Sequence, residues 1–518
     1  MAADHSKFQR IVILDYGSQY TQLIARRIRE QQVFSEIVRF DTSAAKLREN
    51  RPQGIILSGG PNSVFEAGAP GIDPEIFELG VPVLGVCYGM QLMSQQLGGK
   101  VQPGESREYG KTEMSTEPEN ELFAGLPQKF VVWMSHGDRV SAIPAGFKVS
   151  ATSANCPYAA IRNEEKRFYA IQFHPEVVHT EHGSQILGNF LFKICGCKAD
   201  WKLSSWIDET VAKLKEQVGG EEVVLGLSGG VDSSVVAVLL HRAIGRRLHC
   251  IFVDNGLLRW GEDRQVEEMF RAKLDVDLHI ARAAPRFYAA LKGVSDPERK
   301  RKIIGREFIN VFAEEARRFK RAKFLGQGTI YPDVIESSSA LKGPSQTIKS
   351  HHNVGGLPPD LKFELVEPLR DLFKDEVRAV GRVLGMDPEL LDRQPFPGPG
   401  LGVRILGEVT EEKVKLLQQA DLRVQEEVRK LPDYKTIWQT FAVLLPVRSV
   451  GVMGDQRTYE YTCAIRSVNS IDAMTADWTR LPYETLATMS NRIINEVRGI
   501  NRVVYDISSK PPATIEWE

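Results

Sequence analysis

The sequence contains few cysteines, and it has no excess of charge of either sign. Six cysteines in 518 residues are too sparse for a disulfide framework, so we expect a reducing, cytoplasmic setting. Lysine plus arginine number 66 and aspartate plus glutamate number 67, which gives a net charge of -1. The net charge therefore creates no overall electrostatic attraction to nucleic acid or to an anionic membrane, and an anionic ligand must be bound by a local group of residues.

The chain also has no long apolar run and no internal repeat. Its longest uncharged stretch, Gly80–Gly99, contains Pro82, three glutamines and several glycines, so we interpret it as a buried strand, a turn and a helix. The first residues, MAADHSKFQR, lack the apolar stretch and the cleavage site of a secretory signal. No period of about 20–50 residues repeats. These absences predict a protein that is not exported and that binds neither nucleic acid nor a membrane.

What the sequence does contain is an alternation of strands and helices that occurs twice. Chains beyond about 250–300 residues divide into domains, and this length suggests roughly three. Residues 10–100 alternate apolar runs with helical patterns, and a second alternation begins at EEVVLGLSGG. After LDRQPFPGPGLG, charged helices and strands mix. We predict two doubly wound, mostly parallel α/β sheets in residues 1–200 and 201–393, and a smaller α+β domain in residues 394–518.

A cysteine between two glycines is the first candidate nucleophile. Cys87 lies in GVCYG, where a buried strand meets a helix whose N-terminus favours the thiolate. The segment QFHPEV supplies a base and a group to orient it, His174 and Glu176. The turn SGGP, after another strand, offers backbone N–H groups for an oxyanion hole. Taken singly, each feature also fits an inert place in a core, but together they favour a nucleophilic site.

These motifs together resemble those of the class I glutamine amidotransferases. The resemblance implies release of ammonia from glutamine, through a thioester, by a catalytic triad of Cys87, His174 and Glu176. It implies that the oxyanion is stabilised by the N–H groups of Gly59 and Tyr88. The residues that the resemblance assigns to glutamine binding are Gln91, Ser135 and Asp138.

A glycine-rich loop, SGGVDSS, is the second candidate site. It lies between a strand and a helix, so its amides and the helix N-terminus form an anion cradle. A Walker A loop requires a Gly-Lys-Ser/Thr sequence, and a dinucleotide fingerprint requires a different glycine spacing. Asp254, after the next strand, leaves dinucleotide binding as a weaker alternative. A plain turn with a helix cap is the simplest interpretation of a bare glycine pair.

The full loop resembles the pyrophosphate-binding loop of the N-type ATP pyrophosphatases. The resemblance implies adenylation of a carbonyl oxygen by ATP with Mg²⁺, and it assigns Asp232 to the metal, where a helix cap is the alternative role. Backbone amides and a divalent ion stabilise the charge that develops on departing pyrophosphate. The residues implied in ATP binding are Ser228, Gly229, Gly230, Val231, Asp232, Ser233 and Ser234.

The order of the two sites along the chain indicates a more specific family. The chain resembles the family of glutamine-hydrolysing GMP synthases, from DYGSQYTQLIARRIRE to KPPATIEWE. The likeness implies that XMP, activated by ATP, receives ammonia from glutamine and becomes GMP, with AMP, pyrophosphate and glutamate as the other products. It implies a lid at residues 348–358 with Lys349 and a homodimer formed through the last domain. The implied XMP contacts, most of which also fit a solvated surface, are Arg306, Gln439, Arg502, Lys510, Ile515 and Glu516.

Three other functions share part of this pattern. A tRNA-modifying pyrophosphatase carries the same loop, but it needs a basic tract and sulfur-handling cysteines, and near the loop the sequence has Cys250 alone. A nucleotide sensor fits if Cys87 is catalytically silent. NAD synthetase shares the ATP loop but takes its ammonia from a nitrilase-like domain, against which GVCYG and QFHPE argue.

Overall fold

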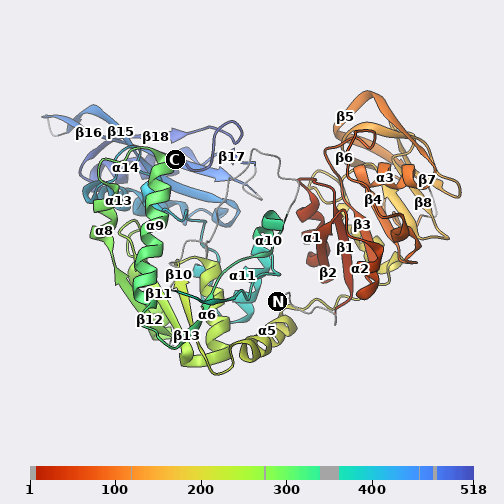
Figure 1. The fold of residues 1–518 in the computed structure, drawn as a ribbon. Helices are drawn as coiled ribbons and strands as arrows, with labels where there is room; N and C mark the ends of the chain where they lie inside the picture. The colour runs from red at the N-terminus through yellow and green to blue at the C-terminus, as the bar shows by residue number, and fades with distance from the viewer. Residues whose placement is uncertain (1–7, 118–119, 274–275, 339–360, 454–455, 471–474) are drawn as a thin grey trace. The chain divides into compact units, whose positions relative to one another are not determined.

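The computed structural model describes residues 8–117, 120–273, 276–338, 361–453, 456–470 and 475–518. As far as it is described, the chain forms two compact units (Figure 1). The first is drawn from Met1–Trp206 and Pro332–Thr347, and the second from Ile207–Tyr331 and Ile348–Glu518. The α/β fold class with two mostly parallel sheets and a smaller α+β part is confirmed, whereas the ranges of the three domains stay predictions.

A nine-stranded sheet forms the centre of the first unit. Its order is β2-β1-β3-β4-β9-β8-β7-β5-β6, parallel from β2 to β9 and antiparallel beyond β9. The strands are β1 Arg10–Asp15, β2 Phe34–Arg39, β3 Gly54–Leu57, β4 Val83–Val86, β5 Lys100–Thr116, β6 Lys129–Ala142, β7 Lys148–Ser153, β8 Ala160–Asn163 and β9 Phe168–Ile171. The helices are α1 Thr21–Glu30, α2 Ala44–Glu49, α3 Tyr88–Gln96 and α4 Gly183–Gly188.

The central parallel strands β3, β4 and β9 are buried because helices cover both faces of such a sheet. Strands β3 and β4 are buried at every position, as their continuous apolar runs predict. The uncharged stretch Gly80–Gly99 contains β4 and α3, which confirms its interpretation as strand, turn and helix. Among the described residues, we find no helix whose length and apolar character would let it traverse a lipid bilayer.

The second unit contains two sheets. A five-stranded parallel sheet has the order β12-β11-β10-β13-β14, and in the other sheet β16 pairs with β15 and β17 antiparallel and with β18 parallel. The strands are β10 Glu222–Leu227, β11 Leu248–Asp254, β12 Asp277–Arg282, β13 Ala322–Gly326, β14 Glu364–Val366, β15 Gln439–Met453, β16 Gln456–Asn469, β17 Asp477–Trp478 and β18 Ile500–Asp506. Its helices are α6 Val231–Ile244, α7 Glu262–Glu267, α8 Ala284–Leu291, α9 Pro297–Ala316, α11 Lys374–Val383, α12 Pro388–Leu391, α13 Glu411–Val428 and α14 Tyr483–Glu496. Helix α5, Leu203–Val218, and helix α10, Tyr331–Ser338, each contain residues of both units.

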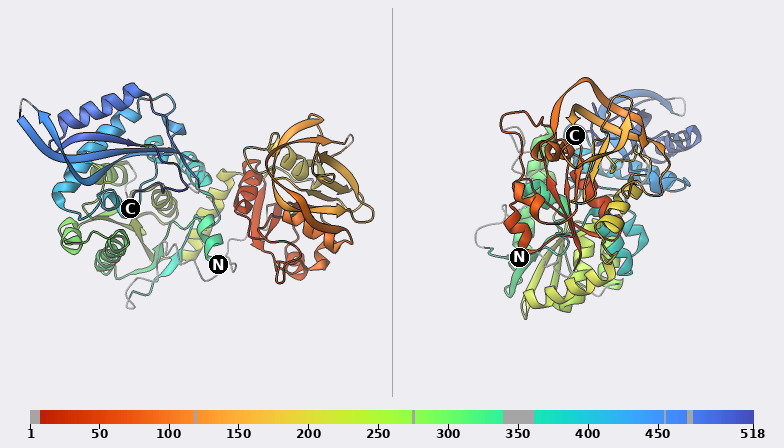
Figure 2. Two further views of the ribbon diagram at one scale, coloured as in Figure 1. Left: turned by 90° about the horizontal axis from the view of Figure 1, so that it is seen from above. Right: turned by 90° about the vertical axis from the view of Figure 1, so that its right-hand side faces the viewer.

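One continuous core joins these two sheets. Buried residues of β10 and β11, such as Val224 and Ile251, belong to the same cluster as Leu417 of α13 and Leu444 of β15. The far end of the β15–β16 hairpin extends beyond the helices of the unit (Figure 2). The second unit therefore brings the glycine-rich loop and the C-terminal sheet into one body.

Candidate active sites

Cys87 occupies a sharp turn between β4 and α3. Its φ of 51° lies in the left-handed region, which non-glycine residues adopt only where the surroundings hold them there. A Cβ on Gly85 would lie 2.7 Å from the carbonyl oxygen of Gly89, and one on Gly89 would overlap the carbonyl oxygen of Leu57. The two glycines of GVCYG are therefore required by backbone packing. The turn presents the thiol at the N-terminus of α3, where the helix dipole favours an anion.

His174 and Glu176 lie beside this thiol. His174 Nδ1 is 2.7 Å from Glu176 Oε1, and both side chains are buried. Burial alone lowers the pKa of His174, but the Glu176 carboxylate and hydrogen bonds with Cys87 and Glu176 raise this pKa well above its ordinary value. The histidine backbone is fixed by Trp133 O, which accepts its N–H at 3.1 Å. The structure thus brings the three predicted triad residues together.

The SGGP turn and the predicted glutamine-binding residues gather around the same place. A Cβ on Gly59 would lie 3.1 Å from His174 Cε1, so this turn touches the imidazole. The Cys87 thiol donates to Ser135 O at 3.6 Å. Gln91 Nε2 donates to Asp138 O at 2.9 Å.

Tyr88 provides the first residue of α3, and the following helix amides already have partners. Gly89 N donates to Ser58 O at 3.1 Å, and Gln91 N donates to Cys87 O at 3.2 Å. The sequence analysis missed Tyr20, whose ring packs edge-on against His174 with centroids 5.2 Å apart. Tyr20 carries no motif, so only the fold reveals its position.

The SGGVDSS loop connects β10 to α6 and is closed by its own hydroxyl groups. Gly229 has a φ of 72°, which glycine adopts without strain. Ser228 N and Gly230 N donate to hydroxyl oxygens of Ser233 and Ser228, each at 3.3 Å. Ser234 Oγ donates to Gly230 O at 2.8 Å. The loop forms the strand-loop-helix cradle that its sequence predicts, with Val231 as the first residue of the helix.

Side chains from distant segments complete the surroundings of this loop. Lys374 Nζ pairs with Asp232 Oδ2, and Arg393 donates to Gly229 O at 3.2 Å. Asp232 Oδ1 is buried and has no hydrogen-bond partner within the described chain. An orphaned carboxylate oxygen is a ligand that Mg²⁺ prefers, so this residue fits the predicted metal role. Lys374 and Arg393 were missed because single basic residues in helical or loop sequence give no signal.

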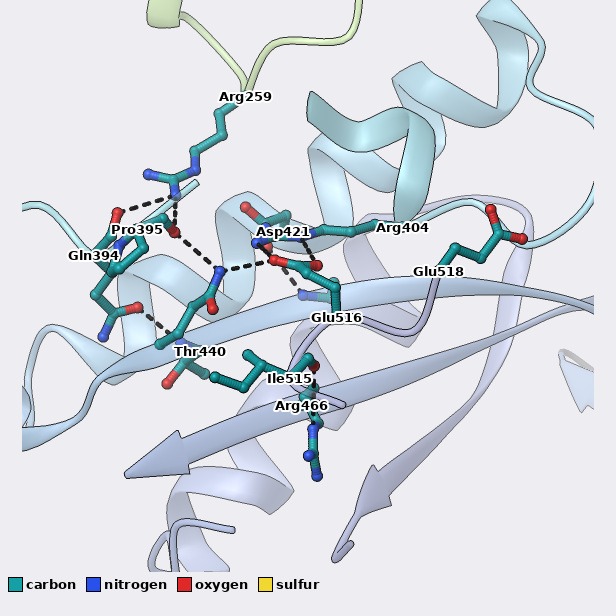
Figure 3. A network of polar contacts seen from close by, with 12 residues as sticks. Arg259, Gln394, Pro395, Arg404, Asp421, Thr440, Arg466, Ile515, Glu516 and Glu518 are labelled. Carbon is teal, nitrogen blue, oxygen red and sulfur yellow. Dashed lines mark hydrogen bonds and ion pairs between the residues drawn. The ribbon is translucent and has the colours of Figure 1, made fainter. Parts of the chain in front are cut away.

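Three of the predicted XMP contacts belong to one polar network in the C-terminal part of the second unit (Figure 3). Glu516 receives two hydrogen bonds from the buried Arg404, at 3.0 and 2.9 Å, and a third from Gln439 Nε2 at 2.9 Å. Arg466 Nε donates to Ile515 O at 3.4 Å. The network fixes the segment around Glu516 against β15 and β16.

The other predicted XMP contacts are not in this network. Arg306 on α9 and Arg502 on β18 are exposed, and the backbone of Lys510 forms a bridge with Ala476. Lys349 lies outside the described residues. The sequence also missed Arg404 and Arg466, whose full burial no local pattern indicates.

Asp254 lies at the end of β11, as predicted for a residue that binds a ribose. Its Oδ1 accepts the N–H of Gly256 at 3.0 Å. This bond gives Asp254 a local turn role. The fold of the loop and the comparisons below favour the nucleotide-activating interpretation over a dinucleotide site.

Family comparisons match the chain in three consecutive parts. Residues 12–194 match the family "Glutamine amidotransferase class-I". Residues 202–298 match "NAD synthase". This agrees with the expectation from the sequence that this chain and NAD synthetase have the same type of ATP loop. Residues 426–517 match "GMP synthase C terminal domain".

Individual relatives match over the whole chain. The GMP synthase [glutamine-hydrolyzing] of Brachyspira hyodysenteriae is 57% identical over 513 residues, covering 99% of this chain and 100% of the relative. That of Geobacillus kaustophilus is 58% identical over 510 residues, with coverages of 98% and 99%. The solved structure of a putative GMP synthase subunit from Thermoplasma acidophilum is 33% identical and covers 36% of this chain and 94% of its own, with a TM-score of 0.32. This chain belongs to the family of glutamine-hydrolysing GMP synthases, ligases of the amidotransferase type that carry out glutamine-dependent GMP synthesis.

Proposed function

We propose that the first unit releases ammonia from glutamine at Cys87. The thiolate attacks the amide carbon, and His174, oriented by Glu176, gives a proton to the leaving ammonia; a water then cleaves the thioester to glutamate. The N–H groups of Gly59 and Tyr88 stabilise the oxyanion. The observation that carries this proposal is the contact of the strained Cys87 turn with the buried His174–Glu176 pair.

The second unit activates XMP at the SGGVDSS loop. ATP binds with its phosphates at residues Ser228–Ser234, and XMP attacks the α-phosphorus through its carbonyl oxygen, so that pyrophosphate leaves. Ammonia then displaces AMP and gives GMP. Mg²⁺ held by Asp232 supplies charge neutralisation at the phosphates when it is bound. The cations Lys374 and Arg393 beside the loop support an anionic ligand there.

XMP binds next to the C-terminal network. Gln439 and Glu516 offer amide and carboxylate groups that can pair with the polar edge of a purine. Arg404 holds Glu516 in place, and Gln439 donates to Glu516. Ile515, Lys510, Arg306, Arg502 and Lys349 are further contacts suggested by the resemblance. Arg502 is exposed on β18, and its replacement should raise the KM for XMP less than replacement of the buried Gln439.

We further propose that the protein acts as a cytoplasmic homodimer joined through the β15–β16 hairpin. Val450, Val452 and Tyr459 of this hairpin are all more than half exposed, at 59%, 73% and 63%. Apolar side chains in such number on one projecting element favour an interface. Sedimentation should show a dimer, and Val452→Asp should shift it to monomer; a monomeric parent protein would contradict the proposal.

A substrate panel tests the chemistry. Purified protein is incubated with ATP, Mg²⁺ and ammonium, together with XMP, IMP or UTP, and AMP and the aminated nucleotide are measured. Of the three nucleotides, only XMP should react, and it should give equal amounts of AMP and GMP. The same products should form when glutamine replaces ammonium as the nitrogen source. AMP formation with IMP or UTP at the same rate as with XMP would contradict the assignment of the acceptor.

A further inference from the structure

A second group of reactive side chains lies in the first unit, and it includes His136, the residue that follows Ser135. Glu108 on β5, His136 on β6 and Cys156 after β7 each offer one ligand atom, and these three atoms lie within 4.8 Å of one another. All three residues are buried, with exposures of 7%, 7% and 1%. Glu108 and His136 are direct partners across the β5–β6 ladder, so the sheet itself places them face to face.

Two facing atoms of this group lie close together. Glu108 Oε2 and His136 Nε2 are 3.3 Å apart, within ion-pair distance, and neither atom makes a hydrogen bond to any other described residue. A charge-assisted hydrogen bond between an imidazolium and a carboxylate is normally about 2.7–2.9 Å long. Two ligands that each lie about 2.0–2.2 Å from a tetrahedral zinc ion are about 3.3–3.6 Å apart. The observed spacing of 3.3 Å therefore fits two ligands of one ion.

The atoms of Glu108 and His136 that would not bind the metal have hydrogen-bond partners, as is usual for metal ligands. His136 Nδ1 lies 3.0 Å from Asp138 O; because a carbonyl can only accept a hydrogen bond, Nδ1 carries the hydrogen and Nε2 has the lone pair that can coordinate a metal. Ser153 Oγ donates to Glu108 Oε1 at 3.3 Å and accepts the N–H of Cys156 at 3.1 Å. One serine thus makes hydrogen bonds with both Glu108 and Cys156. One thiolate and one carboxylate also balance the charge of a divalent cation, which offsets the cost of burying it.

We propose that Glu108 Oε2, His136 Nε2 and Cys156 Sγ bind one Zn²⁺ ion. The sulfur, nitrogen and oxygen ligand set is one that zinc accepts, and three protein ligands leave a fourth position for water. Its ligands come from β5, β6 and the turn that follows β7, so the ion joins the antiparallel strands at the outer edge of the sheet.

Metal analysis of the full-length protein tests the site. The protein is stripped with a chelator, reloaded with Zn²⁺ or Co²⁺ and desalted, and bound metal is measured by mass spectrometry. We expect about one ion per chain, and at least about a tenfold weaker affinity in Glu108→Gln and Cys156→Ser. Glu113→Gln is the matched control on β5, since Glu113 is exposed. The Co²⁺ protein should show a thiolate-to-cobalt charge-transfer band that Cys156→Ser removes.

Two further variants exclude other sources of bound metal. His279→Ala disrupts the other described group of potential ligands, His249, Asp277 and His279, and should retain the ion. Cys197→Ser should retain the cobalt band. The proposal is overturned if the parent protein keeps no ion, if the ion is lost in His279→Ala but not in Cys156→Ser, or if the band depends on Cys197. If circular dichroism shows that Cys156→Ser does not fold, the test uses two other results. These are the weaker metal affinity expected of Glu108→Gln and the thiolate-to-cobalt band expected of the parent protein.

Discussion

The two strand-to-helix turns that carry the proposed chemistry are built in different ways. At Cys87 the turn is fixed by backbone atoms, because Gly85 and Gly89 pack directly against carbonyl groups. At the SGGVDSS loop the turn is closed by serine hydroxyls and by ionic side chains from far along the chain. A nucleophile must be held at one point, whereas a phosphate-binding loop must exchange its internal contacts for those of a ligand. The difference predicts that the first site is sensitive to steric change and the second to charge.

The largest effect is expected where a single atom performs the chemistry. Cys87→Ala should lower glutamine-dependent GMP formation at least about a thousandfold, because no other group replaces the nucleophile. Ammonium-supported synthesis should stay unchanged. Both rates are measured by GMP release, with Cys197→Ala as the control for loss of a buried thiol in the same unit. Equal loss of both activities would show that the two sites are not separable.

Charge at the loop should have the next largest effect. Asp232→Asn should lower ammonium-supported AMP formation by about a hundredfold or more, since stabilisation of phosphate charge by a metal ion contributes several kcal/mol. Glutamine hydrolysis should be retained. Asp208→Asn is a matched control, because the Asp208 side chain is 74% exposed. An unchanged rate of AMP formation would remove Asp232 from the proposed metal role.

A pair of glycine variants tests the steric side of the comparison. Gly89→Ala should destabilise the first unit by about 1–3 kcal/mol, because its Cβ meets fixed backbone. Gly230→Ala should change stability by less, since its Cβ would meet the movable Ser228 Oγ at 3.2 Å. Calorimetric Tm values measure both effects. Equal shifts for the two variants would mean that the turns do not differ as described.

The smallest effect concerns pH. The pKa of His174 is raised in the folded protein, so the stabilisation from its charged form is complete below about pH 6.5, the ordinary value, and is lost as pH rises through the higher folded value. Glu176→Gln removes the carboxylate and should lower this pKa. The Tm difference between parent and variant should therefore shrink from pH 6.5 upward. A difference that grows with pH would contradict the assigned charge state.

Local sequence predicted the elements that carry the chemistry. GVCYG and SGGVDSS each contain their own strand end, glycine spacing and helix start, so both turns formed where expected. The apolar runs TFAVLLPV and YTCAIRSV also predicted strands, and these runs lie within β15 and β16, which are longer. The XMP contacts were less predictable, because Arg306 and Arg502 resemble ordinary exposed residues in the structure as well as in the sequence.

What the sequence alone determined is short-range: periodicity, glycine placement and turn chemistry act within a few residues, and they specify strands, helices and loops directly. Tertiary structure alone decided which remote residues meet. Lys374 reaches Asp232 across 142 positions, Arg404 reaches Glu516 across 112, and Glu108 faces His136 because β5 pairs with β6. Such contacts depend on strand order and crossover connections, which no local pattern encodes.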